Sequence, residues 1–272
     1  MTGRILITGA SGHLGAHLAT RAEAGGWSVT GTHFSAPSAY AKEGLDVREP
    51  AAVRALLART RPDAVIHTAT GTDDWAVIAD GAAHVAVATA ALGIRLVHIS
   101  SDAVFSGRDV RYDESAHPDP IHRYGAAKAA AETAVRAVHP SAAVVRTSLI
   151  LGDGRGRHET HTRDLIAGRV TGALFTDVYR RPVHVTDLAS ALLELASSDY
   201  AGILNITGPD TISRYDLGVL IAHRASLDPT LLPSGTLTDA GLRLPADVRL
   251  TTTRATALLR TTLRGVHEFM AT

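Results

Sequence analysis

Short apolar runs alternate with segments of helical periodicity through the first half of the chain. The runs are bounded by Gly, Pro or polar residues, as is typical of strands buried on both faces of a parallel sheet. The runs that predict strands span residues 4–7, 27–32, 63–68, 95–99 and 144–146, and the segments that predict helices span 14–24, 49–59, 82–92 and 124–138. This alternation predicts an α/β fold, specifically a Rossmann-type doubly wound parallel sheet.

The composition changes beyond residue 150, where a loop rich in glycine and charge covers 152–161. The patterns that follow predict a helix around 164–168, a strand and long helix over 183–196, a short strand at 204–207, a helix over 213–222 capped by Ser213, and a terminal helix over 253–270. We therefore expect a dinucleotide-binding domain at 1–150, with a return segment at about 183–200. A smaller C-terminal substrate-binding lobe would comprise 151–182 and 201–272.

A glycine-rich turn follows the first predicted strand and opens the first predicted helix. In such a turn one glycine permits the tight bend, one lets the backbone approach a pyrophosphate, and one allows close packing of helix on strand. The helix N-terminus then faces the anion with its free N–H groups and its dipole. The residues predicted to bind the pyrophosphate of a dinucleotide are Gly9, Ser11, Gly12, His13, Leu14 and Gly15.

The end of the second predicted strand bears on the choice of cofactor. An NAD site usually has an acidic residue here for the ribose hydroxyls, whereas this chain has Thr32 and His33. No negative charge would repel a 2′-phosphate, so NADP(H) is favoured and NAD(H) is the alternative. Asp46 is expected to bind the adenine edge, with capping of the next helix as its other role. Further cofactor contacts are expected at Val47, Thr68, Ala69 and Thr70.

Polar residues that could perform carbonyl chemistry lie at the end of the fourth strand and on the helix after it. Tyr124 and Lys128 are four residues apart and therefore neighbours on one helical face. Hydride delivery to a ketone leaves an alkoxide that needs an acid, and Tyr124 is placed to supply the proton. Lys128 is expected to lower the pKa of that phenol, and Ser101 to donate a hydrogen bond to the carbonyl oxygen. The alternative for Tyr124 and Lys128 is a solvated i, i+4 pair, and the alternative for Ser101 is a strand-end cap. Ser100 is the other candidate for the role given to Ser101.

These motifs, in their order and spacing, resemble the extended short-chain dehydrogenase/reductase superfamily. The resemblance rests on the three glycines, Asp46, Ser101 and Tyr124-x-x-x-Lys128. Within the superfamily, several further segments resemble the dTDP-4-dehydrorhamnose reductases, namely 100–107, 146–148, 182–189, 208–209 and 245–250. The resemblance implies reduction of a nucleotide-activated keto sugar, a ribose contact for Lys128, substrate contacts for Ser100, Asp102 and Ala103, and often a homodimer.

Two departures from the family pattern accompany this resemblance. The family has an asparagine on the helix before the fourth strand, but 77–80 reads Val-Ile-Ala-Asp. Ala103 stands where the resembling reductases often have a tyrosine that touches substrate. The related sugar-nucleotide dehydratases have a glutamate there for water elimination, so that reaction is disfavoured for this chain. An epimerase that keeps its cofactor bound and a non-catalytic binding module, such as the regulatory β subunit of methionine adenosyltransferase, are the alternatives to a reductase.

Charge and composition exclude several classes of function. Lysine plus arginine equals aspartate plus glutamate at 27 each, so the charge balance predicts neither nucleic-acid nor membrane binding. With no cysteine, thiolate nucleophiles and cysteine-based metal sites are excluded. His158 and His161 lack the spacing of a zinc helix, so no metal is expected. Arg157 and Arg180 are candidate contacts for a diphosphate. No leader or membrane-spanning run is recognised, which predicts a cytoplasmic protein.

Overall fold

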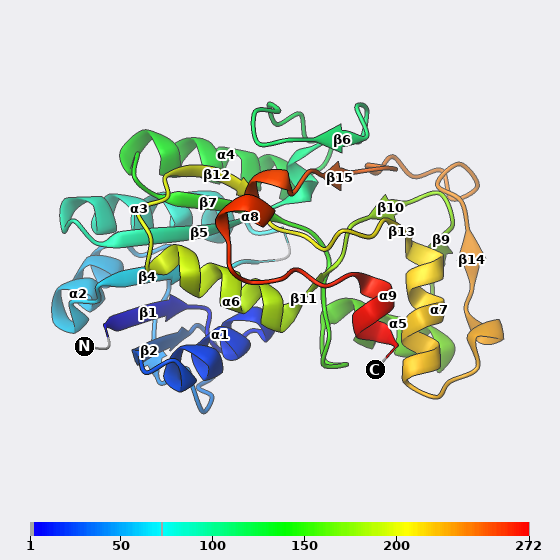
Figure 1. Cartoon of the computed structure of the whole chain (residues 1–272), viewed down its shortest axis with the longest axis horizontal. Helices are drawn as coiled ribbons and strands as arrows, with labels where there is room; N and C mark the ends of the chain where they lie inside the picture. The colour runs from blue at the N-terminus through cyan, green and yellow to red at the C-terminus, as the bar shows by residue number, and fades with distance from the viewer. Residues whose placement is uncertain (1–2, 72, 272) are drawn as a thin grey trace.

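Seven parallel strands form the central sheet of the computed structural model, which describes residues 3–71 and 73–271. Their spatial order is β12-β7-β5-β4-β1-β2-β3, and Figure 1 shows them stacked through one half of the molecule. Their bounds are β1 Arg4–Thr8, β2 Ser28–His33, β3 Glu43–Gly44, β4 Ala64–His67, β5 Arg95–Ser101, β7 Ala143–Thr147 and β12 Gly202–Asn205. The strand order reverses beside β1, where ligands bind in open α/β sheets.

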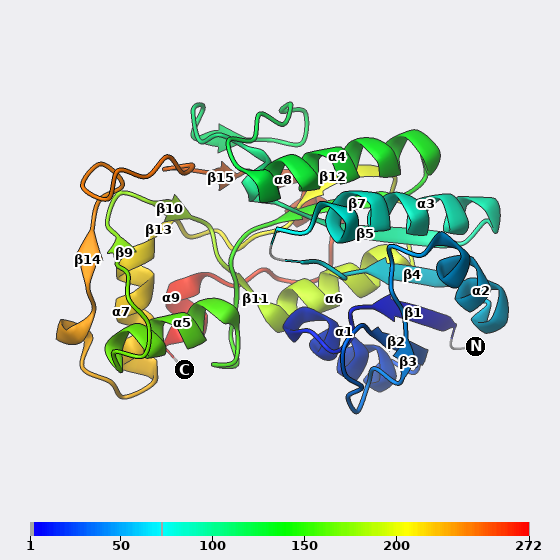
Figure 2. The same cartoon turned by 180° about the vertical axis from the view of Figure 1, so that it is seen from behind.

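Helices cover both faces of this sheet. Helices α1 (His13–Ala24) and α6 (Val185–Ala196) pack together on one face, while α2 (Pro50–Thr60), α3 (Gly81–Ala91) and α4 (Arg123–Val138) cover the other. The two opposite views show these layers (Figures 1 and 2). The predicted doubly wound α/β fold is therefore confirmed.

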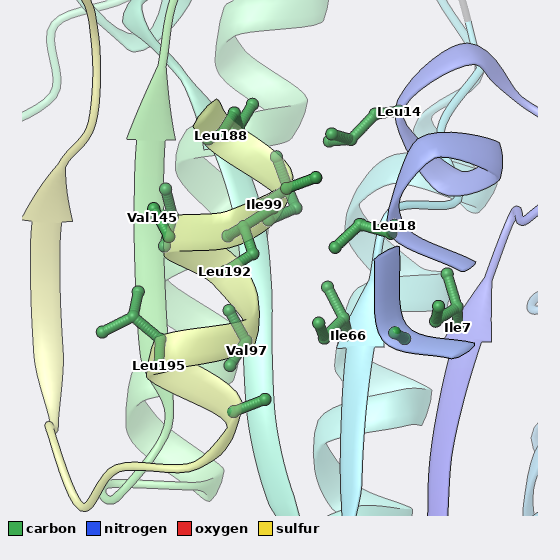
Figure 3. Packing of buried hydrophobic residues seen from close by; sticks show 14 of the residues in the cluster. Ile7, Leu14, Leu18, Ile66, Val97, Ile99, Val145, Leu188, Leu192 and Leu195 are labelled. Atoms are coloured by element: carbon green, nitrogen blue, oxygen red, sulfur yellow. The ribbon is translucent and has the colours of Figure 1, made fainter. Parts of the chain in front are cut away.

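The apolar runs of the sequence form the core between these layers. Ile5 and Ile7 of β1 face α1 and α6, whereas Leu6 points to the opposite face, and all three are essentially inaccessible to solvent. Figure 3 shows Leu188, Leu192 and other side chains of α6 closing over the strands. Complete burial of each such side chain contributes about 1.5–3 kcal/mol. The central strands are apolar on both faces because both faces are covered.

The second half of the chain builds a smaller group of elements beside the carboxyl ends of the strands (Figure 2). Its helices are α5 (Arg157–Ile166), α7 (Arg214–Arg224) and α9 (Val266–Met270), and its own apolar cluster includes Leu217 and Phe269. Short strand pairs connect it: β8 (Ile150–Leu151) with β11 (Val183–His184), β9 (Leu174–Phe175) with β14 (Ser234–Gly235), β10 (Tyr179–Arg180) with β13 (Ile212–Ser213), and β6 (Arg111–Tyr112) with β15 (Arg249–Leu250).

Three predicted boundaries in this half are wrong. Helix α5 begins at Arg157, seven residues before the predicted start at 164, because Glu159 accepts the N–H groups of Gly152, Gly154 and Gly156 and so orders the turn. Strand β12 belongs to the central sheet, so the return segment runs past residue 200. The predicted helix over 253–270 is α8 (Thr253–Leu258) and α9, separated by 259–265.

Two carboxylates of α6 hold that separating segment in a non-helical conformation. Glu194 accepts the N–H groups of Arg260 and Thr261, each at 2.8 Å, and Asp187 binds Arg264 through its backbone N–H and its guanidinium. These bonds replace the i→i−4 bonds that a continuous helix would make. Among the residues described, no helix combines the length and apolar character needed to span a bilayer.

Candidate active site

The glycine turn between β1 and α1 forms a close-packed cradle. Gly9 has φ +70°, and a Cβ atom at Gly15 would lie 2.3 Å from the carbonyl oxygen of Gly9 and 2.7 Å from the Cα of Ala10. The first-turn N–H groups of α1 have no intrahelical acceptor. Only glycine fits at position 15. Such a close-packed turn is what a dinucleotide pyrophosphate site requires, and the pyrophosphate contacts of these residues stay a prediction.

Neighbouring threonines support this cradle from behind. The Thr32 hydroxyl accepts the N–H of Gly9 at 3.2 Å and is buried, so it braces the turn and is not free for a ribose. Thr8 accepts the N–H of Ala69 at 3.3 Å, and Thr68 donates to the carbonyl of Thr8 at 2.7 Å. These bonds fix the ends of β1, β2 and β4 side by side at the reversal of strand order.

The predicted adenine contact is occupied by a neighbouring arginine. Arg48 donates to both carboxylate oxygens of Asp46 at 2.6–3.0 Å, and its guanidinium carbon lies 5.1 Å from the centroid of the exposed Phe34 ring. The Arg48 side chain holds the pKa of the Asp46 carboxyl below its usual value. His33 packs beside Gly44. Val47 is buried, and its carbonyl oxygen lies 3.0 Å from the Nδ1 of His84. Arg48 was not predicted from the sequence. Its guanidinium lies beside Phe34, just after β2, where the sequence has no acidic residue.

Ser101, Thr70 and Tyr124 come together at the carboxyl end of β5. The side chains of Ser101 and Thr70 lie close enough to the Tyr124 phenol to act on its pKa, and the Tyr124 ring lies 5.9 Å from the Lys128 Nζ. His122 caps α4 through its Nδ1, which accepts the N–H of Gly125 at 3.0 Å. A Cβ atom at Gly125 would lie 2.1 Å from the carbonyl oxygen of Ala103, so glycine lets α4 start against the end of β5.

The ionisation of this pair differs from the sequence expectation. Burial and the charge of Asp102 raise the pKa of Tyr124, whereas Lys128 was expected to lower it. The Lys128 ammonium instead donates to the carbonyl of Ile99 at 3.0 Å, and burial lowers the pKa of Lys128 to about 8. Tyr124 is therefore a protonated phenol at neutral pH, the form that a proton donor requires.

Ser100 is turned away from this group. Its hydroxyl donates to Glu132 at 2.5 Å within a buried network in which Arg146 binds both oxygens of Glu132. Successive residues of a strand point to opposite faces, so Ser100 and Ser101 cannot share one role. The substrate contact predicted for Ser100 has no support in this geometry, since the side chain is 2% exposed and already paired.

Two buried histidines lie on the strands beneath Lys128. His67 and His98 are paired in register on β4 and β5, and their rings stack at 5.4 Å. The Nδ1 of His67 pairs with the Thr8 hydroxyl at 2.7 Å, while its Nε2 and both nitrogens of His98 have no partner within the described residues. Burial lowers the pKa of His67 to about 3 and that of His98 well below its usual value. Both rings are thus neutral beside the ammonium.

The side of the site that faces the smaller group of elements carries several cations. Arg180 is not free, because it donates to the carbonyls of Tyr179, Pro245 and Ala246 and lies 3.5 Å from Asp102. Arg157 is exposed, and its charge acts on Tyr124 and Arg214.

Arg214 at the start of α7 is a residue that sequence reasoning missed. Its Nη2 lies 3.1 Å from His158 Nδ1, and its Nη1 is buried without a hydrogen-bond partner in the described part of the chain. Burial and the charges of Arg180 and Arg157 lower its pKa to about 10. The predicted Ser213 cap could have signalled it, because that cap puts residue 214 at a helix N-terminus.

Comparison with known proteins identifies the family to which this chain belongs. A model of the RmlD substrate binding domain matches residues 3–270. A dTDP-4-dehydrorhamnose reductase of Mycobacterium tuberculosis (strain CDC 1551 / Oshkosh) is 32% identical over 83% of this chain and 77% of its own length. The dTDP-4-keto-6-deoxy-D-glucose reductase of Streptomyces niveus is 30% identical over 84% of this chain and 81% of that protein.

A solved structure extends the similarity to nearly the full length of both chains. The dTDP-4-dehydrorhamnose reductase of Bacillus anthracis, crystallised with NADP, has a TM-score of 0.85 and 26% identity, covering 100% of this chain and 98% of that one. The glycine cradle and the grouping of Ser101, Tyr124 and Lys128 lie on the fold that these relatives share. The chain therefore belongs to the RmlD substrate-binding family, within the extended short-chain dehydrogenases/reductases.

Proposed function

We propose that this protein is an NADPH-preferring reductase of a nucleotide-activated keto sugar, most specifically a dTDP-4-keto-6-deoxyhexose 4-ketoreductase. The observation that carries the proposal is the grouping of Tyr124 with Ser101, Thr70 and Lys128 at the carboxyl end of β5. A pure binding module has no need of such an acid. The relatives named as reductases of dTDP-keto sugars support the substrate class.

The side chains divide the work of carbonyl reduction between them. NADPH, when bound, supplies the hydride to the keto carbon. Ser101 donates a hydrogen bond to the carbonyl oxygen, which stabilises negative charge as it develops there. Tyr124 then donates its phenolic proton to that oxygen. The Lys128 ammonium supplies positive charge beneath the site, and we assign it the ribose of the cofactor as well.

The glycine cradle and the residues of β2 and β4 would hold the cofactor. Gly9, Gly12 and Gly15 would receive the pyrophosphate, and Arg48 at the adenine end would offer positive charge to a 2′-phosphate. For the substrate, we assign the diphosphate to Arg157, which is exposed, and to Arg214, whose Nη1 is without a hydrogen-bond partner among the described residues. Asp102, whose oxygens bind Ser101 and Ser148, would orient the sugar.

The test is coenzyme consumption with dTDP-4-keto-6-deoxyglucose and its epimerised products. We expect turnover that is faster at low NADPH than at the same concentration of NADH. Tyr124→Phe should lower kcat by about 10² or more, the scale of a missing general acid. The matched control is Tyr200→Phe, because that hydroxyl donates to the carbonyl of Ile203 at 2.6 Å and interacts with Arg254, away from the site. Binding of coenzyme without consumption would contradict a reductase and favour an epimerase or a binding module.

A further inference from the structure

Two histidines and an aspartate outside the catalytic group converge at the start of α1. His13 and His17 are four residues apart, and both rings approach Asp153 in the loop 152–156. The Nε2 of His13 lies 2.7 Å from one carboxylate oxygen of Asp153, and the Nε2 of His17 lies 2.9 Å from the other. The ligand atoms of the three residues lie within 4.8 Å of one another.

The spacing and the donor atoms match what a transition-metal ion requires. A histidine pair at i and i+4 presents two imidazoles to one point beside a helix, the arrangement that binds zinc in helical sites. Two nitrogens and one carboxylate suit Zn²⁺, Co²⁺ or Ni²⁺, whereas Mg²⁺ and Ca²⁺ prefer oxygen ligands. Zinc–ligand bonds of about 2.0–2.2 Å in a tetrahedron place ligand atoms about 3.4 Å apart. The two His–Asp153 contacts, at 2.7 and 2.9 Å, would lengthen by about 0.5–0.7 Å to reach this spacing, and any pair near the 4.8 Å limit would shorten.

The surroundings leave room for this ion and for a water ligand. The side chains of His13, His17 and Asp153 are 22%, 20% and 17% exposed, so they are held in place but open to solvent on one side. Arg155 opposes a cation, because its Nε lies 3.0 Å from Asp153. That side chain is 81% exposed, so it can turn into water at little cost when the ion enters. Glu159, in the first turn of α5, is occupied by three N–H groups of the loop.

We propose that His13, His17 and Asp153 form a binding site for a divalent transition-metal cation, with zinc as the reference ion. Because Asp153 and His13 are 140 positions apart in the chain, the ion would fasten the loop 152–156 to α1. That loop leads directly into α5 and Arg157. The site is separate from the hydride and proton chemistry, and it stands or falls independently of the keto-sugar assignment.

The experiment is a metal titration of the full-length protein without an affinity tag. After chelator treatment, Zn²⁺ binding is measured by calorimetry, and Co²⁺ binding by its visible d–d absorption. The chain has no cysteine, so a cobalt spectrum reports only nitrogen and oxygen ligands. His17→Gln and Asp153→Asn remove one ligand each. His161→Gln is the matched control, because it changes a half-buried histidine of the adjacent helix α5. Melting of each metal-free variant checks that it folds.

The expected result is one Zn²⁺ per chain in wild type and in His161→Gln. Each ligand variant should lose at least about tenfold in affinity, as even weaker perturbations of metal sites do. Zinc should raise the melting temperature of wild type more than that of Asp153→Asn. Absence of zinc binding to wild type, wild-type affinity in both ligand variants, or a preference for Mg²⁺ would each overturn the proposal. If one ligand variant fails to fold, the other still decides between these outcomes.

Discussion

Replacement of Glu132 by glutamine should destabilise the protein through the charge that it leaves on Arg146. The Arg146 guanidinium is inaccessible to solvent, and Glu132 accepts from it at 2.7, 3.0 and 3.2 Å. Among the described residues, the Arg146 guanidinium also contacts the carbonyl of Ala116 at 3.2 Å and the face of Phe105 at 4.9 Å. Neither contact neutralises a positive charge. Glutamine has nearly the same shape, so the substitution removes charge without opening a cavity.

The expected loss is about 3–5 kcal/mol, the usual cost of breaking a buried ion pair by removing one partner. This is a large share of the roughly 5–15 kcal/mol that stabilises a typical domain. With a urea m-value of about 3 kcal/mol/M, at the upper end of the range for small proteins, the unfolding midpoint should fall by about 1–2 M. Circular dichroism over a urea series measures this midpoint directly.

The double variant Glu132→Gln/Arg146→Met separates charge from packing. Because it leaves no unpaired buried charge, its midpoint should recover most of the loss. The control is Glu43→Gln, which removes one partner of the exposed pair with Arg59 and should change the midpoint by little. A midpoint for Glu132→Gln within about 0.3 M of wild type, near 1 kcal/mol at this m-value, would refute the reasoning.

Three further predictions address the pH dependence and the cradle. The native pKa of Lys128, about 8, lies below its ordinary value of 10.5. Because the ammonium form is the active one, kcat/KM should fall as the pH rises through about 8. A profile that is flat from pH 7 to 10 would contradict this assignment. The pKa of His67 is lowered from 6.5 to about 3. The free energy of unfolding that neutral His67 contributes is therefore complete above pH 6.5 and is lost as the pH falls toward 3, at up to about 1.4 kcal/mol per pH unit. Urea midpoints across this range should fall less steeply in His67→Asn. Gly15→Ala would force Cβ against the Gly9 carbonyl and should weaken NADPH binding at least about tenfold, measured by fluorescence titration, whereas Gly25→Ala, on the far end of α1, should leave it unchanged.

Local patterns predicted the strands and the glycine turn because both depend on neighbouring residues. Apolar runs define β1, β4 and β5 directly, and three glycines define a turn within seven residues. The position of α5 depended instead on Glu159, which reaches back to the N–H groups of a charged loop. The break in the terminal helix depended on Glu194, which lies 66 residues before Arg260. No local propensity reports a partner at that distance.

The sequence predicted that Tyr124 and Lys128 lie together, but it did not predict their pKa values. The i, i+4 spacing of Tyr124 and Lys128 placed both on α4, yet the pKa of Tyr124 depends on burial and on Asp102, neither of which the spacing contains. Arg180 looked free because its three backbone carbonyl partners carry no sequence signature. The pairing of His13 with Asp153 could likewise be found only in three dimensions.

The two edges of the central sheet determine how copies of this protein can meet. An open strand edge offers unpaired N–H and C=O groups on which another chain can add. At one edge β3 is only the two residues Glu43–Gly44. At the other edge α8 packs beside β12, and the Asn205 side chain donates to the carbonyls of Tyr112 and Thr251. Strand addition therefore has little template at either edge, which protects the folded protein from edge-to-edge aggregation.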